Sequence, residues 1–138
     1  MRVELTRCYR FPAAHVLCQP SLGPEENERI FGKCANPAGH GHNYGIEVTV
    51  TGPLDENGWV ADPDALDAVF DDLVRGPFSH RMLNELDAFA ELVPTAENLA
   101  RVVHRDLAPV LAERTGARLV RVRVVETARN SFEVGEPR

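Results

Sequence analysis

The segment HNYGIEVTVTG, residues 42–52, alternates apolar and polar side chains in the manner of a half-buried β-strand. Ile46, Val48 and Val50 share one side of the pattern, while threonines and a glutamate occupy the other. The alternation begins near residue 43 and ends at a turn-forming Gly-Pro pair. The polar side indicates that one face of the sheet is solvated or forms an interface.

Similar alternation predicts three further strands. The run VELTRCYRF, residues 3–11, precedes the first segment, and ARLVRVRVVET, residues 117–127, follows much later. A short run, SFEV at residues 131–134, is expected to add the fourth. Cys8 lies inside the N-terminal run, and we expect it to be a small buried apolar residue. Arg121 and Arg123 are expected to serve the polar face of this strand or an interface.

Two helices are predicted between the second and third strands. The tripeptide Asp-Pro-Asp at residues 62–64 combines a capping side chain, a proline suited to the first helical position and an acid near the positive end of the dipole. An apolar stripe at helical spacing then continues to residues 76–77. The second helix opens at Thr95 and ends near residue 116, and Pro109 is expected to kink or split it.

The order strand, strand, helix, helix, strand, strand, without an internal repeat, predicts an α+β fold with two helices on one face of the sheet. A chain of 138 residues can bury about 70% of its unfolded surface, so residues 1–138 are expected to form one domain. Residues 12–41 show no sustained period, which predicts a long irregular segment with a functional role. The uncovered sheet face requires a partner and suggests an oligomer.

Composition narrows the classes of function. A net charge of -6 argues against a nucleic-acid or anionic-membrane surface, although a local pocket could still bind a phosphorylated small molecule. The three cysteines contain no C-x-x-C pair, so neither a disulfide framework nor a zinc ribbon is indicated. The N-terminus lacks the apolar stretch of a signal peptide, and no apolar run reaches membrane-spanning length. We therefore expect a reduced, cytoplasmic protein.

Three histidines form a candidate metal site. His40 and His42 flank a glycine, and in an extended strand this spacing places both imidazoles on one face. His15 follows the N-terminal strand, and hairpin-like pairing would bring it beside the other two. Three protein ligands with a free fourth position are typical of catalytic zinc. Lone histidines are more often ordinary surface residues, and we expect that of His104.

Cys34 lies in a polar turn just before this histidine pair. Lys33 and a nearby zinc ion would stabilise its thiolate and lower the pKa of the thiol. Cys34 is therefore either a fourth zinc ligand that closes a structural site or a base held beside an open one, and spacing does not decide between them. Glu126 continues the apolar row of the third strand, so it either reaches solvent at the strand end or meets a buried partner.

Several blocks of the sequence resemble a known family. Residues 21–52, SLGPEENERIFGKCANPAGHGHNYGIEVTVTG, closely resemble the corresponding segment of the 6-pyruvoyl-tetrahydropterin synthase family. FPAAH at residues 11–15, PTAENLA at residues 94–100 and VRVVET at residues 122–127 match further blocks. The resemblance implies a T-fold, which is a four-stranded antiparallel sheet with two helices on one side. It further implies that three subunits close a barrel and two trimers form a homohexamer, with active sites between subunits.

The resemblance also implies an activity. The expected substrate is 7,8-dihydroneopterin triphosphate, from which triphosphate is eliminated while hydrogens move along the side chain, giving 6-pyruvoyl-tetrahydropterin. The alternative within the family is 6-carboxytetrahydropterin synthase of the queuosine route, which cleaves the side chain and releases acetaldehyde. A pterin-binding zinc module without catalytic activity is a second alternative.

The family resemblance also implies a role for each matching residue of the site. His15, His40 and His42 match the zinc ligands, Cys34 matches the proton-abstracting cysteine and His80 matches the second proton-transfer residue.

The pterin and triphosphate contacts follow in the same way. Glu126 matches the acid that anchors the pterin, and Thr95 with Glu97 falls in the block that lines its pocket. Lys33 and Arg129 are candidates by position for binding the triphosphate.

One position departs from the family pattern. An aspartate usually precedes the histidine that His80 matches, and Ser79 stands there instead. A serine can donate a hydrogen bond but cannot stabilise an imidazolium by charge, so another acid is needed or the second proton transfer slows. Asp87 is a speculative substitute. This departure is the feature that favours the non-catalytic alternative.

Overall fold

The computed structural model describes residues 1–137 and contains one antiparallel sheet with the strand order β1-β2-β3-β4. The strands are β1 (Glu4–His15), β2 (His40–Thr51), β3 (Arg118–Val125) and β4 (Ser131–Gly135). This arrangement confirms the predicted four-stranded antiparallel sheet, including the short C-terminal strand.

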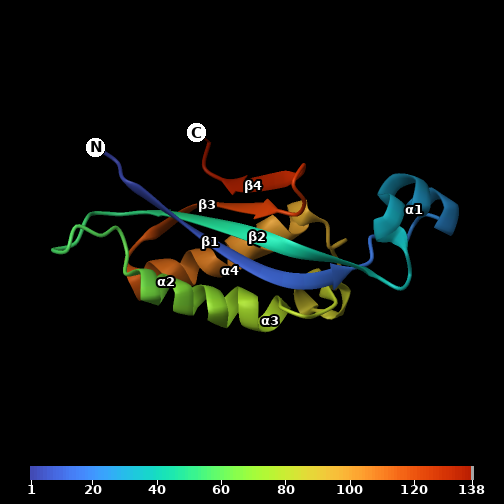
Figure 1. Ribbon diagram of the computed structural model, residues 1–138, viewed down its shortest axis with the longest axis horizontal. Coiled ribbons are helices and arrows are strands. Elements are labelled where there is room, and N and C mark those ends of the chain that lie inside the picture. Colours follow the sequence, from blue (N-terminus) through green and yellow to red (C-terminus); the bar gives the residue numbers. More distant parts are fainter. Residues whose placement is uncertain (138) are drawn as a thin grey trace.

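Helices cover one face of this sheet (Figure 1). They are α2 (Pro63–Phe70), which continues through a π-helical turn (Asp71–Arg75) into α3 (Gly76–Phe78), and α4 (Ala96–Thr115). A further helix, α1 (Pro24–Phe31), projects beyond the end of the sheet and runs into a 3-10 turn (Gly32–Ala35). None of the described helices has the length and apolar character needed to cross a membrane.

The core lies between the sheet and α2 with α4. Ile46 and Val48 of β2 are at most 1% exposed, and they face Val69 of α2 and Leu99 of α4, which are fully buried. Burying one such side chain stabilises the fold by about 1.5–3 kcal/mol. The period-two pattern that predicted β2 therefore also identified its buried side.

β1 is longer than predicted and β2 begins earlier. β1 continues through Pro12 to His15, and β2 starts at His40, so both histidines lie inside strands. Pro12 is tolerated because β1 is an edge strand, where a missing N–H interrupts no inner ladder. The register pairs His15 with His40 and Ala13 with His42, which fixes the end of the sheet that carries the candidate site.

Helix α1 was not predicted, because residues 12–41 were expected to be irregular. Pro24 occupies the start of α1, and two acids in its first turn favour the positive end of the dipole. Asn27 is 5% exposed, and its side chain accepts a hydrogen bond from Gln19 N and donates to Leu22 O. The Gly-Pro-Glu-Glu start was the signal that could have identified this helix.

Helix α4 is not split at Pro109, so of the two expected effects of this proline, a kink or a split, the split does not occur. It runs unbroken for 20 residues with Pro109 inside it. Pro109 and Arg105 are exposed, so the Arg105 carbonyl that loses a helical donor can be hydrated. Leu107 and Leu111 remain at most 1% exposed in the core and hold the helix on both sides of the proline.

The other face of the sheet is open and charged. Arg121 bonds Glu4 at 2.6 Å and Arg123 bonds Glu47 at 3.0 Å, so these arginines lie on the polar face as predicted. Cys8 is exposed rather than buried, and that prediction was wrong. Cys8 lies between Arg7 and Tyr9, and the adjacent Tyr9 belongs to the core, so alternation turns the thiol to the open face.

Candidate functional site

The three histidines predicted as metal ligands meet at one end of the sheet, on the side covered by the helices. The imidazole centroids of His15 and His42 are 5.0 Å apart, and those of His40 and His42 are 4.7 Å apart. This proximity follows from the β1–β2 register together with the two-residue spacing of the histidines on β2.

His15 is held in one orientation by its surroundings. The side chain is fully buried, and its Nδ1 lies 2.9 Å from the carbonyl oxygen of Pro94 and 3.1 Å from the hydroxyl of Tyr44. Because a carbonyl can only accept, Nδ1 carries the proton and Nε2 presents a lone pair. A carbonyl partner on the far nitrogen is the usual support of a metal-ligating histidine.

Two buried nitrogens in this site lack hydrogen-bond partners. Nε2 of His15 and Nε2 of His42 are both buried and unpaired in the described structure. A buried polar atom without a partner costs about 1–3 kcal/mol, so two such atoms side by side favour a site that binds an ion or a water. Nε2 of His42 lies 3.5 Å from Oε1 of Glu126 without a hydrogen bond between them.

The donor atoms that converge belong to His15, Cys34 and His42. They all lie within 4.8 Å of one another, a spacing that a single cation could bridge. Imidazole nitrogen and thiolate sulfur are the donors that zinc prefers. His40 is half-buried beside His42 but is outside this group. The residues present therefore fit a metal ion, and the predicted ligand set of His15, His40 and His42 remains a prediction.

Both converging imidazoles are neutral at neutral pH. Burial lowers the pKa of His42 to about 4, with further contributions from the charges of His15 and His40. Burial also lowers the pKa of His15, and the Pro94 carbonyl only partly opposes this effect. Neutral imidazole is the form that binds a metal ion.

Cys34 reaches the site from the 3-10 turn after α1. Leu17 N donates a 2.6 Å hydrogen bond to the Cys34 carbonyl oxygen, which ties this turn to the end of β1. Burial raises the pKa of the Cys34 thiol, and the negative charge of Glu126 raises it further. The lowered pKa expected from Lys33 is therefore not found. Lys33 is exposed and makes no ion pair within residues 1–137, so a bound cation is needed to stabilise the thiolate.

Glu126 is a half-buried carboxyl group beside the histidines. Its side chain is 14% exposed, so it does not simply reach solvent at the strand end. Burial raises the pKa of Glu126, the charge of Glu97 adds to this effect, and His40 opposes it. Thr95 accepts a hydrogen bond from Asn98 N as the cap of α4, and Glu97 is exposed in the first turn of that helix.

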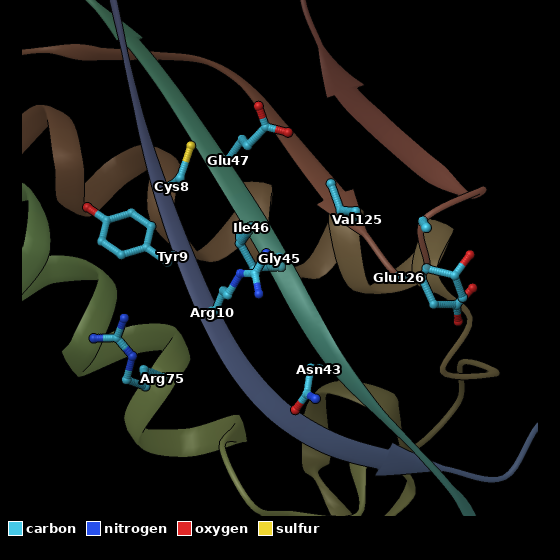
Figure 2. A pocket seen from close by; sticks show the side chains of 12 residues that line it. Cys8, Tyr9, Arg10, Asn43, Gly45, Ile46, Glu47, Arg75, Val125 and Glu126 are labelled. Atoms are coloured by element: carbon cyan, nitrogen blue, oxygen red, sulfur yellow. The ribbon is translucent and has the colours of Figure 1, made fainter.

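A hollow that Glu126 lines has a volume of about 770 Å³ and extends over β1, β2 and the start of the β3–β4 turn. Figure 2 shows Glu126 on one side of it and Tyr9 with Arg75 on the other, with β1 and β2 between them. Asn43 and Arg10 also line it, and the motif analysis had not singled them out. The alternation of buried and exposed side chains along β1 and β2 is the signal that could have assigned Arg10 and Asn43 to this face.

His80 lies across the edge of β1. A separate groove of about 410 Å³ is lined by both His42 and His80. His80 N donates a 2.7 Å hydrogen bond to Pro12 O, which fixes its backbone against β1. Within residues 1–137, no hydrogen bond or ion pair joins His80 to Ser79 or Asp87, so the speculative role of Asp87 has no support in the structure.

Comparison with known proteins identifies the family. The sequence profile described as "6-pyruvoyl tetrahydropterin synthase" matches residues 4–137. The chain belongs to the 6-pyruvoyl tetrahydropterin synthase family. This assignment agrees with the fold, because the chain superposes on the structure of Caenorhabditis elegans 6-pyruvoyl tetrahydropterin synthase with a TM-score of 0.87 and 32% identity, over 99% of this chain and 97% of the other.

Relatives within the family carry two names. The 6-pyruvoyl tetrahydrobiopterin synthase of Homo sapiens is 37% identical over 131 residues, covering 94% of this chain and 88% of the relative. A "Probable 6-carboxy-5,6,7,8-tetrahydropterin synthase" of Halobacterium salinarum is 39% identical over 112 residues, covering 70% and 69%. The profile, these relatives and the fold therefore agree on the 6-pyruvoyl tetrahydropterin synthase family.

Proposed function

We propose that this chain is a zinc-dependent lyase that converts 7,8-dihydroneopterin triphosphate to 6-pyruvoyl-tetrahydropterin with loss of triphosphate. The observation that carries the proposal is the convergence of two unpaired buried imidazole nitrogens with a thiol, next to the half-buried carboxyl of Glu126. Members of the family that act on pterins share the chain's fold over almost its whole length.

His15 and His42 would hold the metal, with His40 as the third expected ligand. When bound, zinc supplies a Lewis acid that stabilises negative charge developing on the substrate side chain. Cys34 lies within reach of the same point and removes a proton from the adjacent side-chain carbon. His80 returns or shuttles the proton, because an imidazole can both accept and donate one.

Glu126 would anchor the pterin ring. A pterin presents a ring N–H beside an amino group, and both can donate charge-assisted hydrogen bonds to one carboxylate. Such donors would supply the partner that a buried carboxylate requires. Thr95 and Glu97 at the start of α4 would line the same subsite. The Thr95 hydroxyl oxygen already accepts a bond from Asn98 N, which leaves its hydrogen free to donate.

Formation of 6-carboxytetrahydropterin with release of acetaldehyde is the alternative activity, and the identity to the Halobacterium salinarum relative favours considering it. A non-catalytic pterin-binding role is the second alternative, because Ser79 leaves His80 without an adjacent acid. The protein is proposed to act as a homohexamer. A cytoplasmic location stays a prediction, consistent with three cysteines that are unpaired within residues 1–137.

The test is incubation of zinc-loaded protein with 7,8-dihydroneopterin triphosphate, followed by identification of the products by mass. Triphosphate release without carbon loss supports the pyruvoyl-forming assignment. Acetaldehyde release would replace it with the carboxy-forming activity, and an unchanged pterin would indicate a binding protein. Metal-stripped protein is the control and is expected to be inactive.

A further inference from the structure

The turn that carries Cys34 is held less firmly than the strands that carry the histidines. His15 and His42 lie in the paired strands β1 and β2. Cys34 lies in the 3-10 turn Gly32–Ala35, a described range in which no residue is buried. Helix α1, which leads into this turn, projects beyond the sheet (Figure 1). Packing against the core therefore does not by itself keep the thiol within 4.8 Å of the imidazole nitrogens.

One backbone hydrogen bond joins this turn to the end of β1. Leu17 N donates to Cys34 O at 2.6 Å, and Leu17 is 8% exposed and follows His15 by two residues. The bond closes residues 17–34 into a loop that contains α1. A single hydrogen bond restrains one distance but not the orientation of the turn. The loop therefore needs a second tie if the thiol is to keep its direction.

Asn27 supplies a second tie from inside the loop. Among the residues of α1, all of which the structure describes, Asn27 is the one that is buried, and it is 5% exposed. Its Oδ1 accepts a hydrogen bond from Gln19 N at 2.8 Å. Its Nδ2 has Leu22 O and Gly23 O as its nearest acceptors, each at 3.2 Å. The side chain thus fastens the segment that leaves β1 to the helix that leads into Cys34.

The chemistry of these partners requires an amide at position 27. Gln19 N can only donate and the carbonyl oxygens of Leu22 and Gly23 can only accept, so both ends of the Asn27 side chain are used. A buried amide is costly unless its hydrogen bonds are made. An aspartate would place a negative charge against two carbonyl oxygens, and an alanine would make none of these bonds. Asn27 is therefore suited to bracing the loop rather than to filling an apolar core.

The two ties together fix the Cys34 thiol relative to the sheet. The bond from Leu17 N holds the turn itself, and Asn27 holds the helix that enters it. We propose that Asn27 is a positioning residue that keeps the Cys34 thiol beside the imidazoles of His15 and His42. This inference rests on the proposed function, in which the thiol acts as the base.

The first test is alkylation of metal-free protein by iodoacetamide, with the modification of each cysteine quantified by peptide mass spectrometry. We expect Asn27→Ala to speed the alkylation of Cys34 by about tenfold or more, because release of the turn exposes a half-buried thiol. Cys8 is exposed on the open face of the sheet and should react at the wild-type rate. This measurement needs neither bound metal nor turnover.

Thr115→Ala is the matched control. The Thr115 hydroxyl also joins two segments, because it donates to Leu111 O at 2.7 Å and accepts from Ala117 N at 3.2 Å. It lies at the C-terminal end of α4, whereas the N-terminal end of that helix lies at the site. Thr115→Ala should leave the alkylation of Cys34 at the wild-type rate.

Hydrogen exchange shows whether Asn27→Ala keeps the rest of the fold. The β2 amides should exchange at the wild-type rate, because α1 projects beyond the sheet and opens without it. Amides of α1 should exchange faster.

Turnover of zinc-loaded protein gives the second test. We expect Asn27→Ala to lower kcat by about tenfold to a hundredfold, since a displaced base loses its alignment. KM for 7,8-dihydroneopterin triphosphate should change by less than about twofold, because Asn27 lines neither of the two cavities described within residues 1–137. A purely structural role would instead reduce the amount of active protein and leave kcat per active site unchanged.

Alkylation of Cys34 at the wild-type rate in Asn27→Ala would overturn the inference, as would an equal acceleration in Thr115→Ala or at Cys8. Faster exchange of the β2 amides in Asn27→Ala, or an unchanged kcat, would overturn it too. The proposed function can fail separately. If zinc-loaded wild-type protein leaves 7,8-dihydroneopterin triphosphate unchanged while Asn27→Ala still accelerates alkylation of Cys34 alone, the lyase assignment fails and the positioning of the thiol by Asn27 stands.

Discussion

The reactivity of the Cys34 thiol depends on a positive charge bound beside it. Its thiol is close to His15 and His42, but burial and the charge of Glu126 raise its pKa. A neutral thiol is a poor base, so the reactive thiolate requires a positive charge nearby. Lys33 does not provide that charge, because it is exposed. The same cation that the unpaired imidazoles require would therefore also activate Cys34.

We expect Cys34→Ala to retain zinc and to lose turnover by about 10²–10⁴-fold, which is the usual contribution of a positioned base. Metal content and product formation are measured on the same sample. Cys18→Ala is the control, since Cys18 is exposed and outside the group of converging donors, and it should behave like wild type. Loss of zinc from Cys34→Ala would instead make the thiol a ligand, and unchanged turnover would remove it from catalysis.

Single residues differ in how far the sequence could predict them. The spacing of His40 and His42 specified a common face, because strand geometry repeats every two residues. Burial of Glu126 was not predictable, because a side chain at a strand end can reach water unless another element covers it. The exposed position of Cys8 followed from alternation with Tyr9, but the residue type suggested the opposite.

Elements were predicted well where the pattern was long and poorly where it was short. β3 and α2 have long periodic patterns and lie where they were predicted, and β2 ends as predicted but begins at His40 rather than near residue 43. α1 has only 8 residues and one buried side chain, Asn27, so no apolar stripe marks it. The extension of β1 through Pro12 depends on β1 being an edge strand, which is a property of the assembled sheet.

A polar cluster ties α2 to β1 and makes stability depend on pH. Arg7 Nε and the Tyr9 hydroxyl donate to the same carboxylate oxygen of Asp67, at 3.0 Å and 2.8 Å. The hydrogen bond from Arg7 is the largest cause that lowers the pKa of Asp67 below its ordinary value of 3.8. The folded state therefore favours the ionised carboxylate. This contribution is complete above pH 3.8 and is lost as the pH falls through the lowered folded pKa.

We expect Asp67→Asn to lower the free energy of unfolding by about 1 kcal/mol at pH 7, a small value because the pair is about one third exposed. The difference from wild type should shrink below pH 3.8. Urea unfolding at a series of pH values measures both effects. Asp72→Asn, which removes a more exposed pair with Arg114, should change stability by less than about 0.5 kcal/mol. A difference that stays constant down to pH 3 would contradict this account.

At the scale of the whole molecule, the sheet of a single chain is open at both ends. The open face of the sheet carries ion pairs, and β1 and β4 are both edge strands. Unpaired strand edges favour pairing with another strand, here β1 of one copy with β4 of the next. Such pairing would continue an antiparallel sheet, and three copies joined in this way would close the proposed barrel. The fold class was predictable from the chain, whereas closure depends on contacts between copies.

We expect a solution mass close to 92 kDa by light scattering, which is six times the 15.3 kDa chain mass. A charged residue on the β4 edge should not by itself dissociate the assembly, but Glu133→Pro removes an N–H that points away from β3 and should lower the mass. A mass of one chain for the wild type at micromolar concentration would contradict the hexamer.

The central claim is that His15 and His42 hold a single metal ion. The most direct measurement is the zinc content per chain after reconstitution and removal of excess metal, for wild type and His42→Ala side by side. We predict about one zinc per chain for wild type and almost none for His42→Ala, because losing one of three ligands abolishes tight binding. A zinc-free wild-type protein, or His42→Ala that retains full occupancy, would contradict the account.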